Sequence, residues 1–185
     1  MIDDTLLDAE EKMDKAVAVA KEDFSGIRTG RATSAMFNKI VVDYYGAMTP
    51  VNQLASLQVP EPRMAIISPY DKSSLGIIER AIRECKLGLN PAAADRSIRV
   101  PIPELSEERR RDMVKMIKQL AEEAKVRLRA ARKEGMDSAK KMKADNAITE
   151  DGQKDFEKEV QELTNKNTKK IEDHAVAKEA DLMKV

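Results

Sequence analysis

The chain has 185 residues, with 33 basic and 33 acidic side chains and a formal net charge of zero. One cysteine excludes an internal disulfide and a cysteine-based zinc site, and the absence of any run of about 18 apolar residues argues against a membrane-spanning helix. The acidic N-terminus does not resemble a secretory signal, so we expect a cytoplasmic protein with a reduced thiol.

Residues 1–29 are predicted to form one long amphipathic helix. Apolar residues recur in steps of three and four along one face, and the opposite face is charged. The apolar positions are Ile2, Leu6, Ala9, Met13, Ala16, Val17, Ala20, Phe24 and Ile27. Gly30 can adopt a left-handed conformation and is expected to end this helix.

Residues 31–104 have a different pattern, in which prolines are concentrated and short apolar runs alternate with turns. We predict strands at 39–45, 55–59, 64–68 and 98–102, the last at a sheet edge because prolines alternate along it. A helix capped by Ser73 or Ser74 is expected to bury Leu75, Ile78, Ile82 and Cys85 and to stop at Gly88. This segment is therefore predicted to be a small β/α/β domain.

The helical period returns at residue 105 and continues almost to the C-terminus. Ser106 is predicted to cap a helix of about 40 residues, interrupted at Gly135, and Thr149 to cap a third helix after a turn at 145–148. The second helix has the apolar stripe Met113, Ile117, Leu120, Ala124, Leu128, Ala131, Ala139 and Met142, and the third has Phe156, Val160, Leu163, Ile171 and Leu182.

Three such stripes cannot be buried by isolated helices, so they favour one antiparallel three-helix bundle. The bundle would comprise residues 1–30 and 105–185, with the small domain of residues 31–104 inserted between its first two helices. The predicted fold class is therefore α+β with two domains. Two short connections near 29–31 and 103–106 would form a hinge containing Thr29, Gly30, Glu104 and Leu105.

No catalytic constellation is visible in the sequence, and we expect neither enzymatic activity nor a metal or cofactor. The only histidine, His174, lies within the third helical pattern and is interpreted as a surface or core-edge residue. Cys85 is on the apolar face of its helix and is interpreted as a small buried hydrophobe.

The location of the charges is more informative than their total. Residues 1–30 have 4 basic and 8 acidic side chains, net −4, and residues 31–104 have 9 and 7, net +2. Residues 105–146 have 13 and 8, net +5, and residues 147–185 have 7 and 10, net −3. One basic helix therefore lies between two acidic ones.

At about 100° per residue, several cations of the basic helix fall on one flank of its apolar stripe. We call this set the basic strip; it consists of Arg110, Arg111, Lys118, Lys125, Arg129 and Arg132. One interpretation is a solvated helix face with local ion pairs such as Glu107–Arg111. The other is a surface that binds phosphates, and the few aromatic residues then favour structured RNA over single strands.

Several strings along the whole chain together resemble the bacterial ribosome recycling factor family. They are IRTGRA (27–32), DYYG (43–46) with Thr49-Pro50, NQLA (52–55), LGLNP (87–91), IRVPIP (98–103), EERRR (107–111), EEAKV (122–126) and QELT (161–164), with Lys178-Glu179 and Leu182-Met183 near the C-terminus. The chain departs from the family pattern at Ala130, Lys133, Glu134 and Gly135.

This resemblance implies an L-shaped, monomeric, non-enzymatic factor with a three-helix bundle and a mobile small domain. The family acts after termination and, with elongation factor G and GTP, splits the ribosome into subunits and releases mRNA and tRNA. Its partners would be the 23S ribosomal RNA of the large subunit and elongation factor G, with no DNA or membrane. The family's RNA-contacting arginines correspond to Arg110, Arg129 and Arg132, and its hinge arginines to Arg28 and Arg31, which we also expect to bind RNA.

A second hypothesis comes from a different functional class. The apolar stripes could instead serve a coiled-coil adaptor or chaperone-like cofactor that binds protein partners. The basic strip discriminates between the two, because only an RNA-binding factor depends on its charge.

Overall fold

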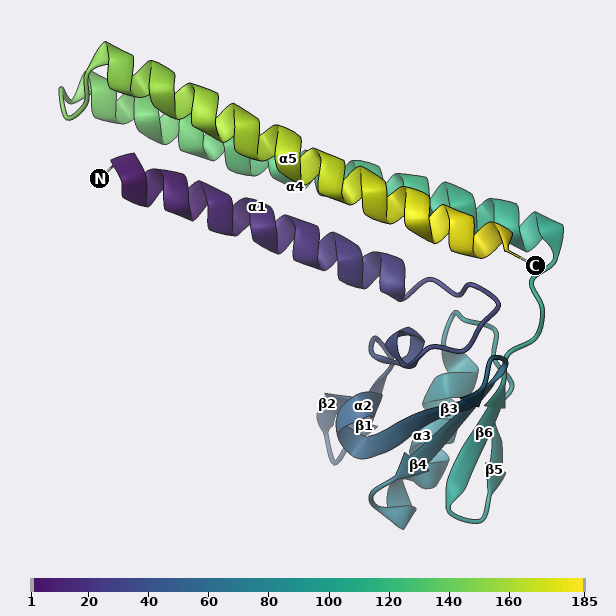
Figure 1. Cartoon of the computed structure of the whole chain (residues 1–185). Coiled ribbons are helices and arrows are strands. Elements are labelled where there is room, and N and C mark those ends of the chain that lie inside the picture. Colours follow the sequence, from purple (N-terminus) through teal and green to yellow (C-terminus); the bar gives the residue numbers. More distant parts are fainter. Residues whose placement is uncertain (1, 185) are drawn as a thin grey trace. The chain divides into compact units, whose positions relative to one another are not determined.

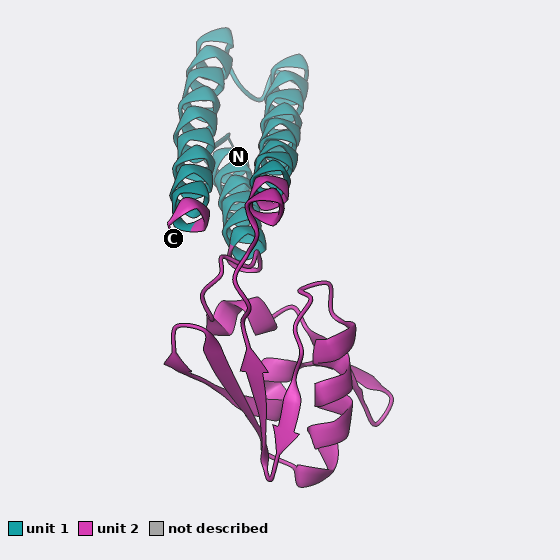
Figure 2. Ribbon diagram, turned by 90° about the vertical axis from the view of Figure 1, so that its right-hand side faces the viewer, with its two compact units in different colours: residues 1–24, 114–181 teal, residues 25–113, 182–185 magenta. Residues whose placement is uncertain are grey.

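The computed structural model describes residues 2–184, and the chain divides into two compact units (Figure 2). Unit 1 comprises residues 1–24 and 114–181, and unit 2 comprises residues 25–113 and 182–185. The sequence analysis placed the domain boundaries after residues 30 and 104. Both positions lie inside unit 2, whose first segment begins at residue 25 and ends at residue 113. Those domain limits stay a prediction, and each unit is described by itself below.

Unit 1 is built from three long helices that lie side by side (Figure 1): α1 (Ile2–Ser25), α4 (Glu107–Ala144) and α5 (Glu150–Met183). Lys12 of α1 pairs with Glu134 near the C-terminal end of α4 at 2.6 Å, and Lys125 of α4 pairs with Glu172 near the C-terminal end of α5 at 2.9 Å. A second contact in each helix pair, Asp23–Arg127 and Arg132–Gln161, shows that residue numbers fall on one helix as they rise on the other, so α4 is antiparallel to both other helices. The predicted fold class, α+β with an antiparallel three-helix bundle, is confirmed.

Both predicted N-caps of the bundle are present. The Ser106 hydroxyl accepts the backbone N–H of Arg109 at 3.3 Å, and the Thr149 hydroxyl accepts the N–H of Gly152 at 3.1 Å. These bonds satisfy N–H groups that have no partner within the helix.

The bundle core contains residues of the predicted apolar stripes and also residues that the apolar periodicity did not predict. Ile117, Leu128 and Ile171 are fully buried, as predicted. Thr164 and Asn167 are also buried, although both are polar. Thr164 satisfies its hydroxyl by donating to the carbonyl of Val160, one turn earlier, at 2.7 Å.

Two predictions about helix ends and breaks were wrong. Helix α1 ends at Ser25 rather than 29; Gly30 does adopt a left-handed φ of +76°, but in the loop that follows. Helix α4 runs without interruption through Gly135, which is buried where α1 and α5 come close. A Cβ on Gly135 would lie 3.4 Å from the Cβ of Ala9 and 3.6 Å from the Phe156 ring, so this glycine permits close helix packing.

The described residues of unit 2 form two antiparallel sheets and several short helices. Strands β1 (Val41–Tyr44) and β2 (Ala47–Pro50) form a hairpin. Strands β3 (Ala55–Glu61), β4 (Met64–Pro69), β6 (Ser97–Pro101) and β5 (Ala92–Ala94) form a four-stranded sheet in the order β3-β4-β6-β5. The short helices are η1 (Ser34–Phe37), α2 (Val51–Leu54), η2 (Lys72–Ser74) and α3 (Leu75–Glu84).

The core of unit 2 lies between the sheet and α3. Ile78 and Ile82 of α3 are fully buried, together with Ile67 of β4 and Ile98 of β6. Each such side chain stabilises the fold by roughly 1.5–3 kcal/mol relative to an exposed one. The alternation along β4 and β6 therefore orients both strands with their apolar sides toward α3.

Several details of unit 2 differ from the sequence prediction; for example, α3 ends at Glu84 rather than at Gly88, and strand β2 was not predicted. Strand β6 is internal, because β5 pairs with it on the side away from β4; the three alanines of β5 carry no recognisable strand pattern. Pro101 is tolerated because it lies at the last position of β6. Ser74 stands at the N-cap position of α3 but makes no side-chain cap bond, whereas Asp71 caps the preceding η2, its carboxylate accepting the N–H of Ser73 at 3.0 Å.

None of the described helices combines the length and apolarity needed to cross a membrane.

The packing at Gly135 generates a prediction about stability. Gly135→Ala should raise the free energy of unfolding by up to about 1 kcal/mol, because alanine favours the helix and its methyl group makes ordinary contacts. Gly135→Val should lower it by about 1–3 kcal/mol through overpacking against Ala9 and Phe156. Urea unfolding followed by helical circular dichroism measures both changes; equal destabilisation by Ala and Val would contradict the packing described here.

Candidate nucleic-acid interface on helix α4

The basic strip lies along α4, most of it within unit 1. Lys118, Lys125, Arg129 and Arg132 belong to unit 1, whereas Arg110, in the first turns of the helix, groups with unit 2. Arg111 also belongs to unit 2. The buried residues Ile117, Ala121, Ala124, Leu128 and Ala131 define the face of α4 that packs inward. Because α4 is continuous from 107 to 144, the strip follows one flank of that buried face.

Lys125 is the most engaged member of the strip. Its ammonium lies 3.1 Å from Glu122 on α4 and 2.9 Å from Glu172 on α5, and only 20% of its side chain is exposed. The hydrogen bonds that Lys125 donates to Glu172 and, to a lesser extent, to Glu122 raise the pKa of Lys125, so it stays charged. A ligand phosphate would have to compete with two carboxylates at this position.

The two arginines that follow are held more loosely. Arg132 donates to the amide oxygen of Gln161 on α5 at 2.8 Å, and this neutral partner leaves its charge uncompensated. Arg129 lies 3.7 Å from Glu122, and both side chains are largely exposed, so this pair contributes little. Both guanidinium groups can therefore reorient toward an incoming phosphate.

The remaining members differ in their local pairing. Arg111 pairs with Glu107 at 2.5 Å, as the solvated-helix interpretation predicted. Arg110 and Lys118 make no ion pair within residues 2–184. The strip therefore combines uncompensated cations with cations held by acids.

Arg28 is buried within unit 2. It is only 3% exposed, and its guanidinium donates to the carbonyl of Leu87 at 3.0 Å and to that of Pro103. Burial lowers the pKa of Arg28, and the nearby charge of Arg109 lowers it further. The resemblance assigned Arg28 to RNA; the structure instead makes it a clamp that joins three segments of unit 2. Arg31 is exposed.

The residues predicted to form the hinge all fall within unit 2. Gly30 has a positive φ, Leu105 is 7% exposed, and Glu104 pairs with Arg63. Thr29 is half-buried. Their role as a hinge stays a prediction.

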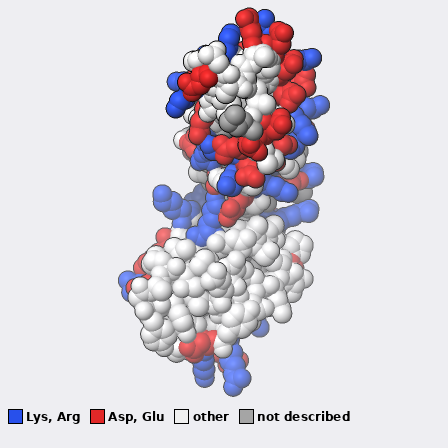
Figure 3. All heavy atoms as spheres, turned by 90° about the vertical axis from the view of Figure 1, so that its left-hand side faces the viewer, with Lys and Arg blue, Asp and Glu red and all other residues white. Residues whose placement is uncertain are grey.

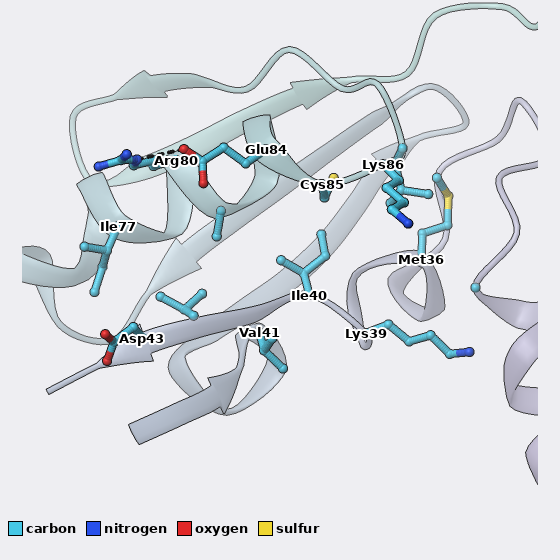
Figure 4. Close-up of a pocket in the computed structure, with 14 residues that line it drawn as sticks. Met36, Lys39, Ile40, Val41, Asp43, Ile77, Arg80, Glu84, Cys85 and Lys86 are labelled. Atoms are coloured by element: carbon cyan, nitrogen blue, oxygen red, sulfur yellow. Dashed lines mark hydrogen bonds and ion pairs between the residues drawn. The ribbon is translucent and has the colours of Figure 1, made fainter. Parts of the chain in front are cut away.

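A cavity of about 760 Å³ lies in unit 2 between β1 and α3 (Figure 4). Two of its charged residues, Arg80 and Glu84, pair with each other at 2.8 Å, and its thiol, Cys85, donates to the carbonyl of Ile82. Burial raises the pKa of Cys85, so the thiol is not activated as a nucleophile. These residues do not form a catalytic arrangement.

The two units differ in the charge that they expose. In the view of Figure 3, unit 1 shows many side chains of both signs, whereas the face of unit 2 toward the viewer is almost free of Lys, Arg, Asp and Glu. Such a face offers no charge-assisted contacts to a phosphate backbone. This face of unit 2 is therefore not suited to nucleic acid.

Comparison with known proteins identifies the family. A sequence model described as "Ribosome recycling factor" matches residues 20–183. The chain is 55% identical to a ribosome-recycling factor of Frankia alni and 54% identical to one of Streptomyces avermitilis, each over 100% of both chains. The chain belongs to the ribosome recycling factor family.

Solved structures agree with this assignment to the ribosome recycling factor family. One is a solution structure of the ribosome recycling factor, with a TM-score of 0.77, 38% identity and coverage of 100% of this chain and 98% of the other. Another is described as a Thermus thermophilus ribosome recycling factor with Escherichia coli elongation factor G on the Escherichia coli post-termination complex. It has a TM-score of 0.68, 35% identity and full coverage of both chains.

The resemblance read from the sequence motifs is thus confirmed. Sequence reasoning missed the side chains of α5 that border the strip, Gln161 and Glu172, because helical periodicity gives no register between separate helices. It also missed the burial of Arg28, for which the sequence offers no signal beyond its position between an apolar stripe and a glycine.

The Arg28 clamp generates a prediction. Arg28→Ala removes the donor from two carbonyls and should lower the free energy of unfolding by about 2 kcal/mol. Arg31→Ala, which changes an exposed arginine three residues away, should cost less than about 0.5 kcal/mol. Urea titrations of both variants make the comparison; similar losses would show that Arg28 is not a clamp.

Proposed function

We propose that this chain acts as a ribosome recycling factor. It binds the post-termination ribosome and, together with elongation factor G and GTP, promotes separation of the subunits and release of mRNA and tRNA. The observation that supports this most is a basic strip along α4 of a chain that matches the family over its full length. The chain is not itself an enzyme; it works in the cytoplasm as a monomer, and GTP hydrolysis belongs to elongation factor G.

The strip would bind the phosphate backbone of the 23S ribosomal RNA. Arg129, Arg132 and Arg110 supply planar guanidinium groups that can hold a phosphate through two hydrogen bonds. Lys118 supplies a point charge between them along the helix. Such contacts position a protein on RNA through its shape and backbone and do not require base stacking.

The adaptor hypothesis finds less support. Its protein partners would need the apolar stripes, but Ile117, Leu128 and Ile171 are fully buried within unit 1. Exposing them would unfold the bundle. A partner could therefore reach only the outer faces, which carry many charges and some exposed apolar residues such as Leu7 and Val126.

We further propose that the connections at 29–31 and 103–106 act as a hinge between the bundle and the small domain. Gly30 supports this, because its φ of +76° is readily adopted by glycine and is closed to proline. The adjoining residues Thr29, Glu104 and Leu105 would complete it.

The strip leads to a prediction about binding. Arg132→Glu should reduce affinity for isolated large ribosomal subunits at least tenfold, because it replaces a phosphate ligand with a repelling carboxylate. The matched control is Lys133→Glu, a neighbouring exposed residue off the strip, which should have a much smaller effect. Helical circular dichroism and the unfolding midpoint should not change in either variant.

Salt dependence gives a second readout of the same contact. Four phosphate contacts predict a slope of log affinity against log salt of about −3, and Arg132→Glu should reduce its magnitude by roughly one. A flat response in the unsubstituted protein would favour a protein partner over RNA.

The hinge leads to a separate prediction. Gly30→Pro should impair subunit splitting in the presence of elongation factor G and GTP more than it impairs binding to the large subunit. Gly30→Asn, which keeps a residue able to adopt the left-handed conformation, should retain most of both activities. Light scattering measures splitting and pelleting measures binding; parallel loss of both in Gly30→Pro would argue against a hinge.

A further inference from the structure

Two amide side chains on α5 form a hydrogen-bonded chain that ends at Arg132 of the basic strip. Nη1 of Arg132 donates to Oε1 of Gln161 at 2.8 Å, and Nε2 of Gln161 donates to Oδ1 of Asn165, one turn further along α5, at 2.8 Å. The second bond fixes which way the Gln161 amide faces, because an amide that directs its NH₂ group toward Asn165 directs its oxygen away from it. The oxygen is thereby held toward Arg132.

The cations that border α5 have partners of different charge. Lys125 and Arg132 are both half-buried and lie seven residues apart on α4, so they occupy the same side of that helix, two turns apart. Lys125 meets the carboxylate of Glu172, whereas Arg132 meets a neutral amide. Within residues 2–184, Arg132 has no acidic partner. Helix α5 therefore holds Arg132 without reducing its charge.

This hydrogen bond leaves most of the binding capacity of Arg132 unused. A guanidinium has five N–H donors, and Gln161 accepts one of them. An unrestrained arginine side chain samples many rotamers, and a ligand that must order them loses affinity. A partner that restricts the rotamers beforehand, and does not neutralise the guanidinium, reduces that loss.

We propose that Gln161, oriented by Asn165, is a positioning residue that pre-orders Arg132 for an RNA phosphate and keeps its charge available. The identity of the ligand rests on the proposed function, whereas the ordering of Arg132 is a property of the free protein. A carboxylate at position 161 would hold the guanidinium at least as firmly but would neutralise it. The neutrality of this side chain is therefore as important as its hydrogen bond.

The ordering is tested in the free, full-length protein by ¹⁵N relaxation of arginine side chains. Gln161→Leu keeps a side chain of similar size and removes the acceptor. The order parameter of the Arg132 Nε–H group should then fall by about 0.2, close to the difference between rigid and flexible groups. Arg129, whose contact is with Glu122, is the internal control and should not change. An unchanged order parameter at Arg132 would overturn the proposal.

Binding to isolated large ribosomal subunits separates the hydrogen bond from the charge. Gln161→Leu should weaken binding about twofold to threefold with an unchanged salt slope, because the number of phosphate contacts stays the same. Gln161→Glu should weaken binding about fivefold and lower the magnitude of the slope by up to about one, since Arg132 is then neutralised before it meets RNA. The matched control is Gln153→Glu, which adds the same charge elsewhere on α5 and should have a much smaller effect.

A double-mutant cycle at low salt shows whether Gln161 acts through Arg132. In an Arg132→Ala background, neither substitution at position 161 should weaken binding further. Losses that add to that of Arg132→Ala would indicate a separate or purely structural role for Gln161 and overturn the proposal, as would full affinity in both Gln161 variants. If Arg132→Glu still weakens subunit binding in those cases, the proposed function stands and only the positioning role of Gln161 fails.

Discussion

The burial of three apolar stripes against one another is the constraint on which the rest of unit 1 depends. No long helix can hide such a stripe alone, so α1, α4 and α5 must share one core. Sharing a core fixes the rotation of each helix about its axis. For α4, burial of Ile117 and Leu128 leaves the adjacent flank, which carries the basic strip, at the surface. The same hydrophobic burial that stabilises the bundle therefore also orients its cations.

The charges of the bundle act through their positions relative to its neighbours. Glu172 on α5 forms an ion pair with Lys125. Gln161, about three turns earlier on the same helix, accepts a hydrogen bond from Arg132 without neutralising its charge. A surface ion pair contributes little stability, so the main effect of these partners is to decide which cations remain uncompensated. The basic strip therefore contains cations that acids already neutralise, such as Lys125, and cations that no acid neutralises, such as Arg132.

Unit 2 depends on a different interaction. The buried guanidinium of Arg28 ties the loop after α1 to Leu87 and Pro103, which are far away in sequence. Burying a charge is costly unless hydrogen bonds satisfy it, so this arrangement strongly specifies the course of the connections. Arg28 lies in the loop that follows the end of α1 at Ser25.

The sequence by itself determined the three long helices, their caps at Ser106 and Thr149, most strands of the small domain and the family, because these follow from local periodicity, capping chemistry and motifs. It failed at β5, at the end of α1 and at Gly135, where packing between distant segments overrides local preference. Only the tertiary structure decided which cations are paired and that Arg28 is buried. The reason is physical: pairing and burial depend on side chains brought together from separate elements, and no local pattern encodes that geometry.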